Sequence, residues 1–270
     1  MPITVAALHV YPVKGLKGID LEAARCTGRG LEHDRRWMVV DAAGEFMSQR
    51  EHPRMATVWT ELAAEALVLS APDMPEVGVP LAPPPGPARK VRVWNSVCDA
   101  LDASAEADAW LSRYLGVACR LVYMPETTRR PSNPEFAGEG ELVGFADGYA
   151  YLLVGEASLA DLNARLAARG HPALPMNRFR PNVVLRGSDA YAEDAWGDVR
   201  VGSAVLRGVK PCGRCAVTTT DQATGEVRGP EPLATLATYR DSARFGVMFG
   251  MNFVTVREGR IALGDRLEAA

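Results

Sequence analysis

The sequence predicts a mixed, β-rich α+β fold in which antiparallel strands close into a barrel. Most of the chain consists of short apolar runs, rich in Val, Leu, Trp and Phe, that alternate with Gly and Asp turns. Very short connections join several of these runs, which is typical of antiparallel hairpins and not of parallel strands joined by helices. Two segments alone show the residue spacing of an amphipathic helix.

The first hundred residues are expected to be mainly strands and turns. The expected strands are residues 5–13, 37–41, 45–48, 57–61, 67–70 and 91–94. Asp41-Ala42-Ala43-Gly44 is expected to connect two of them as a hairpin, since Gly44 can take a positive φ. Residues 72–87 are rich in proline, and the repeated loss of backbone donors predicts a surface loop there.

Two helices are predicted from apolar spacing and end signals. The first follows Ser104, a favourable N-cap, and ends at Gly116, which can take the left-handed conformation of a C-cap. The second covers residues 158–169, with Ser158 and Asp161 spaced as a capping box and Gly170 after its end. The polar, turn-rich segment 129–134 between the helices predicts a boundary between two halves.

The second half returns to strands, which suggests an antiparallel sheet that closes. The expected strands are residues 151–154, 182–185, 199–201, 204–206, 216–220, 252–256 and 260–263. Gly202-Ser203 and Glu258-Gly259 are expected to be two-residue hairpin turns. A chain of 270 residues is long for one domain, so two domains and one large β-rich domain are both consistent with its length.

Composition excludes several classes of protein. Lys and Arg total 30 and Asp and Glu total 33, a net charge of -3, which gives no reason to expect nucleic acid or an anionic membrane as a partner. The N-terminus lacks the pattern of a signal peptide, and no apolar run is long enough to span a bilayer. Five cysteines fit reduced thiols better than a disulfide framework, so we expect a cytoplasmic protein.

The strongest local signal for chemistry is the segment Cys212-Gly213-Arg214-Cys215. A thiol-disulfide redox pair would need its first cysteine at a helix N-terminus, but the residues after Cys215 are mostly β-branched and favour a strand. A structural zinc site would need two more ligands, and the sequence has no second cysteine pair. These features weaken the redox and zinc interpretations without excluding them. Two further interpretations are buried cysteines that pack as small apolar residues and a thiolate, favoured by Arg214, that binds a soft metal.

The wider pattern resembles MOSC-domain proteins, in particular the amidoxime-reducing component family. The resemblance rests on residues 211–221 (PCGRCAVTTTD) and on further segments that occur in the same order along nearly the whole chain. These segments are YPVKG at 11–15, DRRW at 34–37, EASLADLN at 156–163, FRPN at 179–182, YAED at 191–194 and FGMNF at 249–253.

The resemblance implies a MOSC β-barrel with a smaller N-terminal β-barrel-like domain, at residues 126–270 and 1–125. It also implies a molybdenum cofactor (molybdopterin with molybdenum), with Cys215 as the metal ligand and catalytic residue. The residues that it implies for binding the pterin and its phosphate are Lys14, Gly15, Arg35, Arg180, Asn182, Gly213, Arg214 and Asn252. Arginine suits such a site because its planar fork can hold a phosphate with two hydrogen bonds.

This sequence departs from the family pattern at a few of these positions. Gly15 stands where relatives often have Ser, and Asn252 stands where a Tyr can donate to the cofactor. Gly148 and Tyr149 likewise replace small hydroxyl residues.

The resemblance implies an oxidoreductase that reduces N-hydroxylated substrates such as amidoximes, hydroxylamines and N-hydroxylated bases. The chain ends near the end of the MOSC domain, without a ferredoxin-like module, so a separate electron donor of flavoprotein, ferredoxin or cytochrome type is expected. The alternative function is a carrier of molybdenum cofactor, or of sulfur as a persulfide on Cys215. MOSC-like domains also occur beside pyridoxal-phosphate sulfurases. The resemblance therefore links the family as a whole, and not specific residues of this chain, to pyridoxal phosphate binding.

Overall fold

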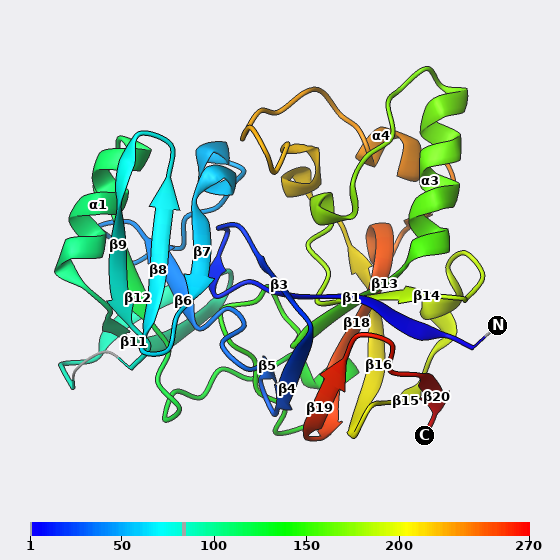
Figure 1. The fold of residues 1–270 in the computed structure, drawn as a ribbon, viewed down its shortest axis with the longest axis horizontal. Helices are drawn as coiled ribbons and strands as arrows, with labels where there is room; N and C mark the ends of the chain where they lie inside the picture. Colours follow the sequence, from blue (N-terminus) through cyan, green and yellow to red (C-terminus); the bar gives the residue numbers. More distant parts are fainter. Residues whose placement is uncertain (1, 83–84) are drawn as a thin grey trace.

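The computed structural model describes residues 2–82 and 85–270, and its largest sheet has nine strands (Figure 1). The order in this sheet is β20-β15-β16-β18-β13-β14-β1-β3, with β17 beside β18. Its strands are β1 (Thr4–Val10), β3 (Ile19–Leu21), β13 (Tyr151–Gly155), β14 (Val183–Arg186), β15 (Asp198–Val201), β16 (Ala204–Gly213), β17 (Asp241–Ser242), β18 (Gly246–Arg257) and β20 (Leu267–Ala269). Neighbours are antiparallel except for the parallel pair β13 and β14.

The large sheet closes on itself through its two ends. The segment that leads into β20 pairs with the beginning of β1, through a bridge between Thr4 and Arg266. Two backbone hydrogen bonds flank this bridge, from Val5 N to Asp265 O and from Leu267 N to Ile3 O, each at 2.9 Å. Apolar side chains from these strands fill the interior, among them Tyr151, Leu153 and Phe253. A closed, mainly antiparallel barrel confirms the predicted fold class.

Three smaller sheets complete the strands, and two of them lie in the first half of the chain, on the side of Figure 1 that carries α1. The five-stranded sheet has the order β10-β11-β12-β6-β2, and the other sheets are β7-β8-β9 and β19-β4-β5. Their strands are β2 (Val13–Lys14), β4 (Ala23–Thr27), β5 (Gly30–Leu31), β6 (Trp37–Val40), β7 (Trp59–Leu62), β8 (Ala66–Ala71), β9 (Met74–Pro80), β10 (Arg89–Val93), β11 (Ser96–Asp102), β12 (Arg120–Tyr123) and β19 (Gly259–Ala262).

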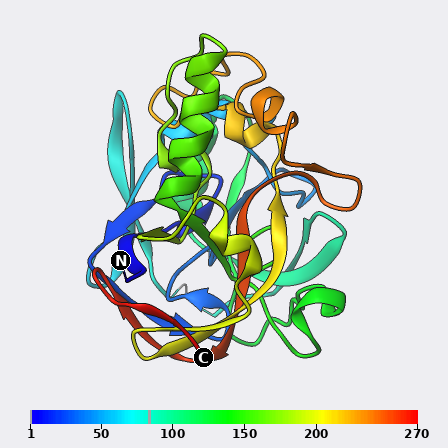
Figure 2. The same ribbon diagram turned by 90° about the vertical axis from the view of Figure 1, so that its right-hand side faces the viewer.

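Within the described residues, four α-helices and several short 3-10 turns connect the strands. The α-helices are α1 (Ala105–Leu115), α2 (Pro134–Ala137), α3 (Glu156–Ala168) and α4 (Leu233–Leu236), and the 3-10 turns are η1 (Pro53–Thr57), η2 (Met176–Arg178), η3 (Ala192–Ala195) and η4 (Ala216–Thr219). Helix α1 confirms its predicted ends, because the Ser104 side chain accepts from the backbone of Ala107 and Gly116 has a left-handed φ of 72°. Helix α3 lies on the side of the molecule that faces the viewer in Figure 2.

The predicted capping box of α3 is wrong, because this helix begins two residues earlier, at Glu156. Its N-terminus is capped from a distant segment. The buried carboxylate of Glu193 accepts from the backbone of Gly155 and from the hydroxyl of Ser158. The predicted end at Gly170 agrees with a φ of 79° directly after the helix.

Two other strand predictions are wrong for local reasons. Residues 216–220 begin with the 3-10 turn η4, not with a strand. The hydroxyls of Thr218 and Thr219 donate to the carbonyls of Cys215 and Ala216, at 3.0 and 2.7 Å, and such bonds three residues back favour a turn over a strand. Residues 45–48 form isolated bridges instead of a strand.

The proline-rich stretch and one predicted turn also differ from expectation. Strand β9 (Met74–Pro80) lies within the predicted loop 72–87, and it is an edge strand, where proline is tolerated. Residues 83–84 of that loop lie outside the described residues. The Gly202-Ser203 hairpin is confirmed by the pair Val201 and Ala204. Glu258-Gly259 is not a hairpin, because β19 pairs with β4 instead of β18.

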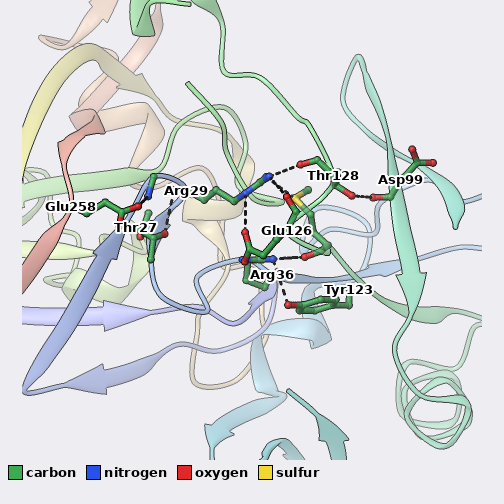
Figure 3. Close-up of polar contacts among 11 residues, drawn as sticks. Thr27, Arg29, Arg36, Asp99, Tyr123, Glu126, Thr128 and Glu258 are labelled. Atoms are coloured by element: carbon green, nitrogen blue, oxygen red, sulfur yellow. Dashed lines mark hydrogen bonds and ion pairs between the residues drawn. The ribbon is translucent and has the colours of Figure 1, made fainter. Parts of the chain in front are cut away.

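Two arginines hold the connection between the halves of the chain (Figure 3). Arg29 donates to the carbonyls of Glu126 and Thr128, and Arg36 donates to the carbonyl of Met124. Both guanidinium groups are also paired with the Glu126 carboxylate. The segment that contains Arg29 and Arg36 is therefore fixed against the connection.

Strands β1 and β3, from the first half of the sequence, lie in the large sheet. The division into domains at residues 1–125 and 126–270 stays a proposal. Among the described residues, no helix combines the length and the apolar character needed to cross a bilayer.

Candidate functional site

One cavity of about 150 Å³ is lined by all nine residues for which the sequence suggested a role at a cofactor. These residues are Lys14, Gly15, Arg35, Arg180, Asn182, Gly213, Arg214, Cys215 and Asn252. They come from the end of β2, the turn before β6, the loop before β14, the end of β16 and the middle of β18. The fold therefore brings together residues that are far apart in the sequence, while their roles toward a cofactor remain predictions.

A buried carboxylate organises the inner wall of the cavity. Asp34 accepts hydrogen bonds from the Tyr11 backbone at 2.9 Å and from the Asn182 side chain at 3.0 Å. It also forms an ion pair with Arg35, whose side chain is 13% exposed. Burial raises the pKa of Asp34, and the charge of Arg35 opposes that shift. Asn182 and Arg35 are thus held in fixed positions by one shared partner.

Two cavity arginines flank the ring of Tyr11. The guanidinium carbons of Arg35 and Arg180 each lie 4.3 Å from the centroid of that ring. Burial raises the pKa of Tyr11 to about 12, so the phenol stays neutral. Burial lowers the pKa of Arg180 to about 10, and the nearby charge of Arg35 acts in the same direction. Arg180 still carries a full positive charge near neutral pH.

A lysine and an aspartate form a pair at another part of the wall. Lys14 donates to the carboxylate of Asp147, which also accepts from the indole N–H of Trp94 at 3.0 Å. Burial lowers the pKa of Lys14, and Asp147 opposes this shift. Burial would raise the pKa of Asp147, but Lys14 and Trp94 outweigh it and hold that pKa below its usual range.

Cys215 and Cys212 have different arginine partners. An Nη atom of Arg50 lies 3.6 Å from the Cys215 sulfur. Arg214, which the sequence suggested as the cation beside Cys215, instead donates to the Cys212 sulfur at 3.0 Å and to the Phe179 carbonyl at 2.7 Å. Both cysteines are free thiols of intermediate exposure.

Two glycines are required by the backbone around the cavity. Gly15 has a φ of 84°, which L side chains rarely adopt. A Cβ atom on Gly213 would lie 2.4 Å from the carbonyl oxygen of Phe245. Gly15 is therefore favoured by its backbone conformation, and Gly213 by its close approach to a neighbouring strand.

The cavity has an excess of positive charge beside a thiol. Lys14 and Arg35 have carboxylate partners, whereas Arg50, Arg180 and Arg214 form no ion pair with any carboxylate of residues 2–82 and 85–270. The Nε atom of Arg214 is also buried without a hydrogen-bond partner. Such a cavity fits an anionic ligand that bears a phosphate, and the thiol of Cys215 fits a soft metal. A molybdenum-pterin cofactor has both properties.

Sequence reasoning did not find several residues of this site. Arg50 and Gln49 line the cavity, and Gln49 exchanges hydrogen bonds with Gln222. Asp147 lies directly before Gly148 and Tyr149, which the family pattern singled out and which also line the cavity. The position of Asp147 beside these two residues could have identified it from the sequence. Arg50 is 165 residues away from Cys215 in the sequence, and no sequence feature linked the two.

Metal-binding side chains do not gather elsewhere in the parts of the chain that the structure describes. No group of three or more His, Cys, Asp or Glu residues there could hold a metal ion. A metal at Cys215 would therefore need further ligands from a cofactor or solvent.

Comparisons with known proteins agree on one family. The description "MOSC N-terminal beta barrel domain" matches residues 2–118, and "MOSC domain" matches residues 141–268. Mitochondrial amidoxime-reducing component 1 of Mus musculus is 34% identical over 97% of this chain and 81% of its own length. Mitochondrial amidoxime reducing component 2 of Homo sapiens is 32% identical over 97% of this chain and 82% of its own length. A crystal structure of the YUAD protein from Bacillus subtilis matches 99% of this chain and 94% of that chain with a TM-score of 0.41 at 9% identity, a likeness too distant to support an argument.

Proposed function

This chain belongs to the MOSC-domain family that includes the mitochondrial amidoxime-reducing components, and from that premise we propose that it is a molybdenum-cofactor-dependent reductase of N-hydroxylated compounds. In this proposal Cys215 is the protein ligand of the metal. The observation that supports it most strongly is a cavity that combines this free thiol with arginines that form no ion pair with a carboxylate of the described residues.

The residues of the cavity have three tasks in this proposal. Arg180 and Arg214, which form no ion pair within the described residues, would hold the anionic part of the cofactor together with Arg35 and Lys14, because charged N–H donors bind phosphate strongly. Asn182 is hydrogen-bonded to Asp34 and Arg35 and would keep the inner wall in place. Cys215 would supply the thiolate, and Gly213 lets the strand before it pass close to the carbonyl of Phe245.

Molybdenum cofactor supplies oxygen-atom transfer coupled to electron transfer when it is bound. The protein would bind and orient this group and leave the cavity mouth open to a small N-hydroxylated substrate. Asp147 and Tyr149 also line the cavity, with polar groups that would be able to contact such a substrate. A separate protein would deliver electrons, and a cytoplasmic location remains part of the proposal.

The test is reduction of benzamidoxime by purified protein with a chemical or flavoprotein electron donor. We expect activity in protein that contains molybdenum and its loss in Cys215→Ser. Full activity of Cys215→Ser would contradict the proposal.

The free, partly exposed thiol of Cys215 also suits the second candidate, a sulfur carrier. Mass spectrometry separates the two functions, because a persulfide on Cys215 in protein without molybdenum would favour the carrier. Trypsin cleaves after Arg214, so Cys215 falls in the peptide 215–228 and is measured apart from Cys212.

A further inference from the structure

We propose that Arg50 is a positioning residue for Cys215: it donates an N–H···S hydrogen bond that orients the sulfur and weakens its electron donation to the metal. The inference rests on the proposed function, since it concerns the sulfur as a ligand.

The contact itself is the first observation. The Nη2 atom of Arg50 lies 3.6 Å from the Cys215 sulfur, within hydrogen-bond range for sulfur. Arg50 is partly buried, lines the same cavity, and forms no ion pair with a carboxylate in the described part of the chain. Its charge is therefore available to the sulfur. Arg214, although adjacent in sequence, is directed to Cys212.

A second observation is that the Arg50 side chain is braced. Its guanidinium lies 4.3 Å from the centroid of the Trp94 ring, a cation–π contact that holds the group in place. The Trp94 indole donates to Asp147, which is paired with Lys14. A continuous set of contacts thus runs from Lys14 to the sulfur of Cys215.

The backbone supports the same arrangement. Trp94 has a φ of 55° because it is the first residue of the two-residue turn between β10 and β11, where Val93 pairs with Ser96. The indole contacts both Arg50 and Asp147, and the ring of Phe46 packs on it with the ring centroids 4.9 Å apart. The first half of the chain therefore supplies the contacts that hold this donor beside a thiol of the second half.

Donors to a ligating atom tune the metal. Removal of such outer partners typically costs about 10- to 100-fold in metal affinity or activity. We expect the same range for loss of the Arg50 donor, together with a change in the electronic structure of the metal centre.

The experiment compares protein loaded with molybdenum cofactor in five forms: wild type, Arg50→Met, Arg50→Lys, Arg54→Met and Cys215→Ser. Arg50→Met keeps the length of the side chain and removes the donor, and Arg50→Lys keeps a charge and a donor. Arg54→Met is a matched control, because Arg54 is exposed, stacks on Tyr114 at 4.1 Å and does not line the cavity. Thermal denaturation confirms that each variant folds.

We expect Arg50→Met to retain molybdenum about 10- to 100-fold less well during dialysis and to shift the electron paramagnetic resonance signal of the Mo(V) state. Arg50→Lys should recover most of the retention, and Arg54→Met should match wild type. The inference would be overturned if Arg50→Met retains molybdenum as well as wild type and has an unchanged Mo(V) signal. If Cys215→Ser loses both the metal and the signal in the same experiment, the proposed function stays intact. Unchanged metal coordination in Cys215→Ser would overturn both. If Arg50→Met does not fold, Arg50→Gln, which also removes the charge, takes its place: weaker retention of molybdenum supports the inference, and wild-type retention with an unchanged signal overturns it.

Discussion

Asp221→Asn should destabilise the protein by removing the partner of a buried arginine next to the thiol. Arg178 is 7% exposed, forms an ion pair with Asp221 at 3.1 Å, and donates to the carbonyl of Thr219 in the 3-10 turn after Cys215. Loss of one partner of a buried pair costs about 3–5 kcal/mol. Because Asp221 is 25% exposed, water replaces part of the interaction and we expect about 2 kcal/mol.

The pH dependence of this loss gives a second check. Burial opposes ionisation of Asp221, but backbone donors and Arg178 outweigh it and hold its pKa below the ordinary 3.8. A lowered pKa in the folded state means that the carboxylate stabilises the protein above the ordinary pKa and stops doing so as the pH falls through the folded value. The difference between wild type and Asp221→Asn should therefore be full near pH 7 and shrink below about pH 4.

The assay is urea denaturation of both proteins across this pH range, with thermal melting as a second probe. A loss of about 2 kcal/mol corresponds to a fall in Tm of about 4–8 °C for a chain of this size. Glu268→Gln is the control, because the Arg200–Glu268 pair is about half exposed and should cost under about 1 kcal/mol. Equal stability of Asp221→Asn and Glu268→Gln at pH 7 would mean that the buried pair of Arg178 and Asp221 stabilises the protein no more than an exposed pair.

Three further variants test other parts of the structure. Gly213→Ala places a Cβ atom 2.4 Å from the Phe245 carbonyl, so urea denaturation should show a loss of about 1–3 kcal/mol; no loss would mean that the chain can shift there freely. Arg180→Met removes a cation that lacks a carboxylate partner, so reconstitution should need about 10-fold more cofactor; unchanged loading would place the phosphate elsewhere. Burial raises the pKa of Glu193 above the ordinary 4.5, so its ionised form destabilises the folded state. The stability of Glu193→Gln relative to wild type should therefore increase as the pH rises above 4.5. A constant difference between the two proteins in urea denaturation from about pH 4 to 8 would contradict this.

The parts of the fold that local chemistry determines could be predicted from the sequence. Helix α1 carries its own start and stop signals in Ser104 and Gly116, and the hairpin at Gly202 needs a residue that tolerates a positive φ. Prediction failed in two ways. Helix α3 begins at Glu156, where the N-cap residue Gly155 donates to Glu193, a partner far along the chain. Residues 216–219 form a 3-10 turn because the hydroxyls of Thr218 and Thr219 bond to nearby carbonyls, which the β-branched pattern did not reveal.

The candidate site shows the same division. The residues predicted at Cys215, Lys14, Arg35 and Arg180 line one cavity, because a pattern that extends along the chain carried them. Arg50 could not be found in this way, since its contact with Cys215 depends on how two halves of the chain meet. The expectation for Arg214 failed in the opposite way. Arg214 is adjacent to Cys215 in the sequence, but its guanidinium donates to Cys212.

X-ray absorption at the molybdenum edge counts the sulfur ligands of the metal and can be compared for wild type, Cys215→Ser and Cys212→Ser. We expect Cys215→Ser to lose the protein-derived sulfur ligand and Cys212→Ser to keep it. A sulfur shell that is unchanged in Cys215→Ser, or that is lost in Cys212→Ser alone, would contradict the assignment of Cys215 as the metal ligand.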